Sequence, residues 1–175
     1  MNVYVLAAEA TAYLLPEFDE LYQKHWGGDY FTWISTTPLN QWSDGVIQLL
    51  TGIDDEYVII LHEDFFLTRD VDVEGIRKLW DYTVENKVDR ASLLGNHTPL
   101  RTYKEREYWR YNAAAEYQFS FEASIQKRSF LLEHLKKGQD PWESETQAKV
   151  HGAYVIATEE PLIFYQDALR RGVRQ

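Results

Sequence analysis

The stretch YVIILHEDFFL, residues 57–67, decides how the rest of the sequence is interpreted. Its first five residues, 57–61, are all apolar and strand-favouring, which is typical of a strand covered on both faces. His62, Glu63 and Asp64 follow directly, and the sequence then returns to aromatic residues. An unpaired carboxylate among buried side chains is costly, so we expect Glu63 and Asp64 to meet a partner at the end of this strand.

The composition is that of a folded globular protein with an acidic surface. Of the 175 residues, 45% are hydrophobic and 15% are aromatic, which is enough for a sizeable core. Cysteine is absent, which excludes disulfides, thiolate zinc sites and a cysteine nucleophile. The net charge of −10 disfavours a general role in coating nucleic acids, although a local basic site stays compatible with it. The first residues lack a basic n-region, so we expect no signal peptide or transmembrane segment and a cytoplasmic location.

Apolar periodicity on both sides of the central strand predicts alternating strands and helices. Strands are expected at 2–8, 30–36 and 90–95, and Asp72 is placed to cap the third helix. The apolar helix stripes are Phe18, Leu21, Tyr22 and His25, then Val46, Leu49, Leu50 and Ile53, then Ile76, Leu79, Trp80 and Thr83. This β-α-β-α-β-α-β order predicts an α/β fold with an open, mainly parallel sheet flanked by helices, whose ligands lie at the carboxyl ends of the strands.

Beyond residue 96 the pattern changes. We expect, in order, a half-exposed strand, a helix, the start of a second helix and two strands, at 117–126, 129–137, 140–143, 152–158 and 161–166. No repeat, linker or low-complexity tract interrupts the chain, so residues 1–175 are interpreted as a single domain.

The acids after the central strand are candidate metal ligands. Side chains alternate along a strand, so His62 and Asp64 share one face while Glu63 points to the other. Mg²⁺ and Mn²⁺ commonly take one or two carboxylates together with water and substrate phosphates. His151, at the start of a predicted strand, is a candidate imidazole ligand. The alternatives are that the acids cap a turn or pair with basic groups, and that His151 is an ordinary hydrogen-bonded strand-end residue.

Glu145 is a candidate general base. It lies near a predicted helix start on the same face as Trp142, three residues earlier. A carboxylate there can accept the proton of an acceptor hydroxyl, and the indole can form an apolar wall for a sugar or base. The alternative is a surface ion pair with Lys149, four residues later.

The segment RTYKEREYWRY, residues 101–111, combines four basic residues with four aromatic ones. This mixture is suited to stacking on a base or sugar while holding phosphates. A solvated edge strand whose aromatic side chains pack inward explains it equally well.

The order of these motifs resembles a known family. They are Trp42-Ser43, the stretch 56–67 with Val71-Asp72, Tyr117 to Ser120, the helix at 129–137, and Pro141-Trp142 with Glu145. Together they resemble small bacterial and phage glycosyltransferase-like proteins of the GT-A type, which include lipopolysaccharide and sugar transferases. The resemblance runs across almost the whole chain and implies a GT-A-like fold with a mixed, mainly parallel sheet.

The resemblance also implies a metal-dependent glycosyltransferase that moves a sugar from a nucleotide-sugar donor to a hydroxyl acceptor. Asp64, together with Glu63, would hold Mn²⁺ or Mg²⁺ against the donor diphosphate, with His151 as a further metal ligand, and Glu145 would be the catalytic base. Contacts to the nucleotide are implied at Ala7, Glu9, Trp42, Asp44 and Glu63. Contacts to the substrate are implied at Trp142, Tyr117, Ser120 and Arg110.

In this interpretation residues 1–96 form a nucleotide-binding half and residues 97–175 an acceptor and catalytic half. Two features depart from the family: the acidic pair is Glu-Asp where Asp-Asp is more usual, and the chain is short, so the acceptor side is either reduced or supplied by another subunit of an oligomer. The acceptor is either a surface glycan precursor or a hydroxylated base in phage DNA. The alternatives are a non-catalytic nucleotide- or sugar-binding module and a metal-dependent phosphodiesterase or nuclease.

Overall fold

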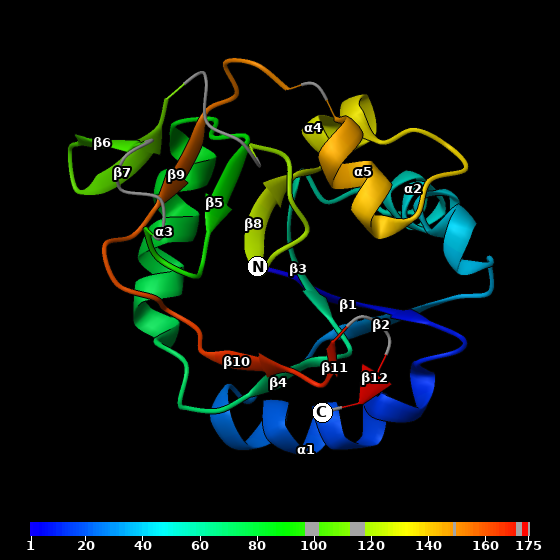
Figure 1. The fold of residues 1–175 in the computed structure, drawn as a ribbon. Coiled ribbons are helices and arrows are strands. Elements are labelled where there is room, and N and C mark those ends of the chain that lie inside the picture. Colours follow the sequence, from blue (N-terminus) through cyan, green and yellow to red (C-terminus); the bar gives the residue numbers. More distant parts are fainter. Residues whose placement is uncertain (97–101, 113–117, 149, 171–172, 175) are drawn as a thin grey trace.

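The computed structural model describes residues 1–175 except for 97–101, 113–117, 149, 171–172 and 175. Its centre is an eight-stranded sheet with helices on both faces (Figure 1). The strands of this sheet are Val3–Ala8 (β1), Phe31–Ser35 (β2), Tyr57–His62 (β3), Arg90–Ser92 (β5), Thr102–Glu105 (β6), Tyr108–Tyr111 (β7), Ser124–Lys127 (β8) and Val155–Ala157 (β9). Their spatial order is β2-β1-β3-β8-β5-β9-β7-β6. The α/β architecture predicted from the sequence is therefore confirmed.

Most strands of the sheet point in one direction. β1 is parallel to both β2 and β3, and β5 is parallel to β9. β8 is antiparallel to both of its neighbours, β3 and β5, so β3 and β5 run the same way. The carboxyl ends of β1, β2, β3, β5 and β9 consequently share one edge of the sheet. Because β8 comes from the second half of the chain and lies between β3 and β5, both halves build the same sheet.

The helices cover the sheet in two groups. They are Leu15–His25 (α1), Val73–Glu85 (α3), Trp42–Gly52 (α2), Arg128–His134 (α4) and Pro141–Gln147 (α5). Apolar residues of α1 and α3 belong to one core cluster, and those of α2 and α4 belong to a second. Figure 1 shows α2, α4 and α5 gathered on one side of the sheet and α3 on the other. Within the described part of the chain, no helix combines the length and the apolar character that crossing a membrane requires.

β3 is covered on both faces, as its run of apolar residues predicts. Ile59 and Leu61 pack into the cluster with α1 and α3, whereas Val58 and Ile60 pack into the cluster with α2 and α4. All four side chains are fully buried. Alternation along the strand therefore sends neighbouring residues into opposite cores, which fixes β3 at the middle of the molecule.

Two predicted helix starts are confirmed by their caps. The side chain of Asp72 accepts a hydrogen bond from the Gly75 backbone N–H at 2.9 Å, at the start of α3. At the start of α5, the Asp140 side chain accepts from the Glu143 N–H at 2.7 Å, and the Glu143 side chain accepts from the Asp140 N–H at 3.2 Å. This reciprocal pair is a capping box, which satisfies two backbone donors that the helix leaves open.

A small second sheet brings the end of the chain beside β3. It consists of Phe65–Leu67 (β4) and Tyr165–Asp167 (β10), which pair antiparallel with Asp167 opposite Phe65. The Ala168 N–H donates to the carbonyl oxygen of Asp64 at 2.8 Å. The remaining short elements are the 3₁₀ helices Ala12–Leu14 (η1) and Leu39–Gln41 (η2) and the strands Leu169–Arg170 (β11) and Val173–Arg174 (β12).

The prediction of a half-exposed strand at 117–126 is wrong in two respects. The strand β8 begins only at Ser124, and the described residues before it, 118–123, are irregular. Ser120 and Ser124, expected on an exposed face, are as buried as Phe119 and Phe121. The reason is that both core clusters cover this segment: Ala123 and Ile125 belong to the cluster with α1 and α3, and Phe119 and Phe121 belong to the cluster with α2 and α4.

Candidate active site

Asp64 lies in the turn between β3 and β4, at the carboxyl edge of the sheet. Its side chain is half-buried, and among the described residues no Lys, Arg or His lies within ion-pair distance of it. Burial raises the pKa of Asp64 to about 7, with further contributions from the carboxylates of Glu63 and Asp167. The ionised form is therefore unfavourable unless a cation accompanies it.

Glu63 has a different environment, because it is bound to the end of β1. Its side chain is 6% exposed and accepts hydrogen bonds from the Ala8 N–H at 3.3 Å and from the Thr11 hydroxyl. Burial nevertheless raises its pKa above the ordinary value. Glu63 thus finds its partners within the protein, whereas Asp64 has no cationic partner among the described residues.

The ring of His62, the residue before Glu63, packs against the ring of Trp42. The two rings stack with centroids 6.0 Å apart, and Trp42 also meets Phe121 edge-on at 4.6 Å. Burial lowers the pKa of His62 to about 4, so the imidazole is neutral at physiological pH. Trp42 is 5% exposed, which makes it a core residue and leaves little of its ring for a nucleotide.

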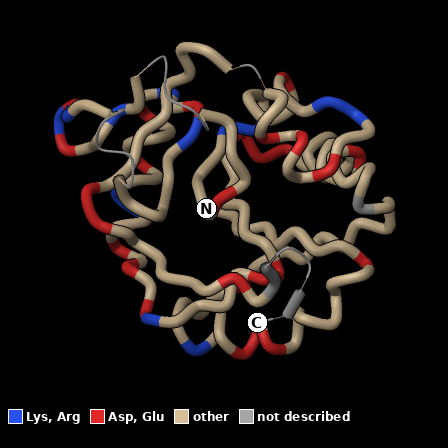
Figure 2. Tube along the Cα trace, in the orientation of Figure 1, with Lys and Arg blue, Asp and Glu red and all other residues tan. Residues whose placement is uncertain are grey.

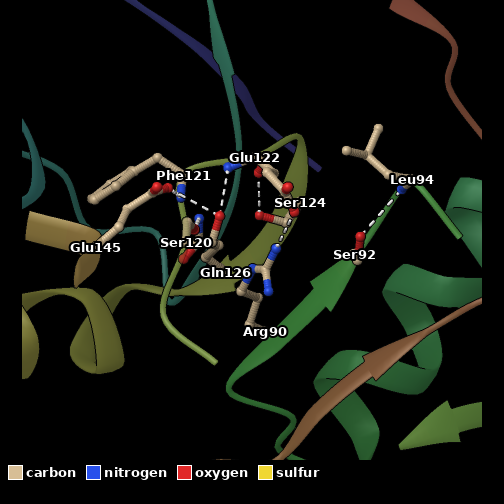
Figure 3. A network of polar contacts seen from close by, with 9 residues as sticks. All are labelled: Arg90, Ser92, Leu94, Ser120, Phe121, Glu122, Ser124, Gln126 and Glu145. Carbon is tan, nitrogen blue, oxygen red and sulfur yellow. Dashed lines mark hydrogen bonds and ion pairs between the residues drawn. The ribbon is translucent and has the colours of Figure 1, made fainter. Parts of the chain in front are cut away.

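Glu145 extends from α5 toward the chain just before β8 (Figure 3). Its Oε1 atom accepts hydrogen bonds from the Phe121 N–H at 2.6 Å and from the Ser120 hydroxyl at 3.0 Å. Burial raises the pKa of Glu145, whereas these two donors and the charge of Arg90 act in the opposite direction. The predicted alternative partner, Lys149, lies outside the described residues.

A buried arginine, Arg90, contributes to the polar network around Glu145. Arg90 is 1% exposed and forms an ion pair with Glu122 at 3.1 Å. The Ser120 hydroxyl accepts a hydrogen bond from the Glu122 N–H at 3.2 Å while it donates to Glu145 (Figure 3). Ser120 therefore joins the two glutamates into one network, and Arg90 supplies its positive charge.

Tyr165 is influenced electrostatically by several acids of the site. Its ring stacks on Phe65 with centroids 4.1 Å apart. Burial raises the pKa of Tyr165, so its hydroxyl stays protonated at neutral pH. Four carboxylates raise this pKa further, and they come from Glu122, Asp167, Asp64 and Glu145. These acids lie on four separate segments of the chain, and the fold brings them to one edge of the sheet.

The carboxylates suit a divalent cation whose coordination is completed by a substrate. Within the described ranges, no group of three or more Asp, Glu or His side chains is placed to hold an ion by itself. Asp64 and Asp167 are close enough to interact electrostatically, and a cation would relieve their repulsion. Since Mg²⁺ is commonly bound by one or two carboxylates plus substrate phosphates, this pair has the chemistry that such a site requires.

A groove of about 460 Å³ lies beyond the carboxyl ends of β1 and β2. Residues 8–11 and 36–38 line it, so Glu9 is placed where a bound nucleotide would contact it. Ala7, the other residue implied on β1, is buried beneath the groove at 3% exposure. The groove has the size of a ligand pocket and occupies the edge at which open α/β sheets bind ligands.

The basic-aromatic segment is not part of this site. Its residues 102–111 form the β6–β7 hairpin at the far edge of the sheet, where Figure 2 shows basic and acidic positions next to each other. Arg110 pairs with Glu105 at 3.0 Å and lies over the Tyr154 ring at 4.1 Å. Three strands separate its strand from β3. The buried rings of Tyr108 and Tyr111 favour an edge strand whose aromatic side chains pack inward.

Other predicted residues also lie apart from Asp64. His151 is exposed and precedes the amino end of β9, which is at the opposite edge of the sheet from the carboxyl end of β3. Asp44 accepts a hydrogen bond from the Gly138 N–H at 2.9 Å and so fixes the connection between α4 and α5. Trp142 is 65% exposed on α5, one turn from Glu145. Tyr117 lies outside the described residues.

Four residues of this site escaped the sequence interpretation, namely Arg90, Glu122, Tyr165 and Asp167. A weak signal existed for Asp167, which directly follows the strand-like run PLIFYQ, and for Arg90, which opens the strand-like run RASLLG. Neither signal has a characteristic spacing to Asp64 or Glu145, because the contacts depend on strand pairing.

Comparison with known proteins supports the fold. No family model matches the sequence, and a search of curated proteins finds no match. Among solved structures, A197 from STIV has a TM-score of 0.53 at 16% identity, over 95% of this chain and 86% of that chain. S. aureus TarS 1–349 has a TM-score of 0.54 at 11% identity, over 96% of this chain. CMP:2-keto-3-deoxy-manno-octonic acid synthetase, complexed with CTP, has a TM-score of 0.51 at 10% identity, over 95% of this chain and 92% of that chain.

The fold is GT-A-like. This likeness confirms, at the level of fold, the resemblance that the motifs predict. The chain spans 61% of the TarS 1–349 structure, so it corresponds to part of that protein. TarS 1–349 has also been solved in complex with UDP and with UDP-GlcNAc, and these structures match over 95% of this chain.

Proposed function

We propose that this chain is a metal-dependent glycosyltransferase that moves a sugar from a nucleotide-sugar donor to an acceptor hydroxyl. The observation that carries the proposal is that Asp64, in the turn after β3, and Glu145, bonded to the segment before the antiparallel strand β8, both lie at the carboxyl edge of a GT-A-like sheet. Two proteins of similar fold, S. aureus TarS and the CMP:2-keto-3-deoxy-manno-octonic acid synthetase, were solved with nucleotide ligands, which supports a nucleotide-binding role.

In this proposal the donor lies along the edge from the groove at β1 and β2 to the acids after β3. Glu9 and its neighbours in the groove contact the nucleoside. Asp64 and Asp167 are the residues that would hold Mn²⁺ or Mg²⁺. When bound, the cation neutralises charge that develops on the leaving nucleotide diphosphate. Glu63 keeps the loop after β1 attached to β3 through its bonds to Ala8 and Thr11.

Glu145 has the geometry of a general base. Its Oε1 atom is fixed by the Phe121 N–H and the Ser120 hydroxyl, while Oε2 accepts no hydrogen bond from the described residues. Burial raises its pKa toward neutrality, which makes the carboxylate a better proton acceptor at working pH. In an inverting transfer the acceptor oxygen bonds to the anomeric carbon as the bond to the diphosphate breaks. The acceptor proton goes to Oε2, and the electron pair leaves with the diphosphate.

A thermal-shift screen of nucleotide sugars, with and without Mn²⁺, tests the donor assignment, because a ligand that binds only the folded state raises its apparent stability. Turnover is measured as release of the nucleotide diphosphate, with water, glycans or hydroxymethylated DNA as acceptor. Asp64→Asn should lose the Mn²⁺-dependent part of the shift. Glu145→Gln should keep the shift and lose turnover, and Glu133→Gln, on the exposed surface of α4, serves as the matched control.

The outcomes separate the alternatives. A non-catalytic binding module would show the thermal shift with no turnover in the unmodified protein. A nuclease or phosphodiesterase would cleave oligonucleotides and would not need a nucleotide sugar. If Asp64→Asn and Glu145→Gln both behave like Glu133→Gln, the assignment of the site is wrong.

A further inference from the structure

A second pocket lies on the other side of the acids. It has a volume of about 280 Å³, and Thr68, Arg69, Leu94, Pro161, Phe164 and Tyr165 contribute to its wall. We call it the Arg69 pocket. Leu94 follows β5 and Pro161 follows β9, so the pocket is at the carboxyl edge on the β5 and β9 side of the sheet. The groove next to β1 and β2 is at the same edge on the opposite side, and the acids after β3 lie between the two.

Arg69 gives this pocket a positive charge, and among the described residues no side chain neutralises it. Its guanidinium lies over the Phe164 ring, 4.8 Å from the centroid, which holds the group at the pocket wall. No carboxylate of the described residues forms an ion pair with it. The adjacent carboxylate, Asp70, is engaged by His25 at 2.9 Å. In a chain of net charge −10, an arginine without an acidic partner beside a pocket indicates an anionic ligand.

Hydroxyl groups complete the polar part of the pocket. Thr68 donates a hydrogen bond from its Oγ1 to the Phe164 carbonyl at 3.3 Å. The lone pairs of the Thr68 hydroxyl oxygen can therefore accept hydrogen bonds from other donors. Tyr165 connects the pocket to the acids, since it lines the pocket and its ring stacks on Phe65, the residue that follows Asp64. The pocket therefore has a cation at its wall and is bordered by Tyr165, next to the segment that carries Asp64.

We propose that the Arg69 pocket binds an anionic group, a phosphate or a carboxylate, of the acceptor. The inference rests on the proposed function and specifies its acceptor class. The opposed charges orient the acceptor, because the acids repel its anionic group while Arg69 attracts it. A hydroxyl on the other end of the same molecule then points past Tyr165 toward Glu145. A neutral sugar of the same size lacks this orienting force.

Binding of three small probes tests the inference: glucose 6-phosphate, glucuronate and glucose, each titrated by NMR into the full chain in the presence of EDTA. The unmodified protein should bind both anions more tightly than glucose. Arg69→Gln should reduce this preference about tenfold, as expected for loss of a charge-assisted hydrogen bond, and Arg69→Lys should retain part of it. Arg77→Gln, an exposed arginine of α3 outside the pocket, should change nothing. The two anions distinguish a phosphate from a carboxylate ligand.

Three results would overturn the inference. The first is equal affinity of the unmodified protein for the anions and for glucose. The second is equal behaviour of Arg69→Gln and Arg77→Gln. The third is a loss of nucleotide-sugar binding in Arg69→Gln by the same factor, which would assign Arg69 to the donor. If the anions bind through Arg69 but no nucleotide sugar binds the unmodified protein, the anion site stands and the transferase assignment fails.

Discussion

Replacement of Asp64 by asparagine should stabilise the metal-free protein, because the wild-type carboxylate is ionised at high pH in a site that disfavours its charge. The structure raises the pKa of Asp64 from an ordinary value of 3.8 to about 7. At about 1.4 kcal/mol for each pKa unit, this corresponds to at most about 4 kcal/mol at pH 8. For a chain of this length the melting temperature should rise by roughly 8–16 °C.

The sign of the pH dependence follows from linkage. Below pH 3.8 Asp64 is protonated in both the folded and the unfolded state, so it does not affect stability. Between pH 3.8 and about 7 the unfolded chain has lost this proton while the folded protein keeps it, so the free energy of unfolding falls as the pH rises. Above about pH 7 the loss is complete. At pH 5 the advantage of Asp64→Asn should therefore shrink to roughly 1.5 kcal/mol.

Urea denaturation in EDTA at pH 5 and pH 8 measures both values, and Asp81→Asn on the exposed surface of α3 is the matched control. Mn²⁺ at pH 8 should stabilise the unmodified protein and Asp81→Asn, but not Asp64→Asn. An effect of Asp64→Asn that is equal at the two pH values, or a net destabilisation at pH 8, would refute the reasoning.

Three further predictions concern the network around Glu145 and the start of α5. Glu145→Gln should keep the free energy of unfolding within about 1 kcal/mol, since the amide oxygen can still accept from the Phe121 N–H, and a larger loss in urea denaturation would contradict this. Arg90→Met should destabilise by roughly 1–2 kcal/mol, because it removes the ion-pair partner of Glu122, whose side chain is 43% exposed and can be solvated; denaturation with an unchanged midpoint would argue against a structural role for the pair. Asp140→Ala should cost about 1 kcal/mol through loss of the α5 cap, measured by thermal unfolding, and an unchanged melting temperature would contradict this.

Local patterns in the sequence predict much of the fold. The five apolar residues 57–61 indicate a strand covered on both faces, and β3 is such a strand. The caps at Asp72 and Asp140 are also predictable, because a capping side chain and its backbone donor lie within three residues of each other. The segment 117–126 is the counterexample. Its alternation is typical of a half-exposed strand, but exposure depends on the neighbours of β8, and these are distant in sequence.

The candidate site also contains some features that the sequence predicts and others that it does not. The sequence places Asp64 after a strand and Glu145 in the first turns of a helix, since both positions follow from periodicity. It gives no indication that Asp167 lies beside Asp64, or that Arg90 pairs with Glu122, because these pairs are 103 and 32 residues apart along the chain. It also makes Arg110 and His151 plausible site residues, and only the order and direction of the strands place them elsewhere.

By itself, then, the sequence determined most of the strands and helices, the caps at Asp72 and Asp140 and the position of one acid at the end of the central strand, because these depend on interactions between residues a few positions apart. The tertiary structure decided which acids face each other, which arginine is buried among them and which one lines a pocket. The physical reason is that a charged side chain acts through space: its partners are set by how β3, β8 and β10 pair, and that pairing depends on the packing of both cores together.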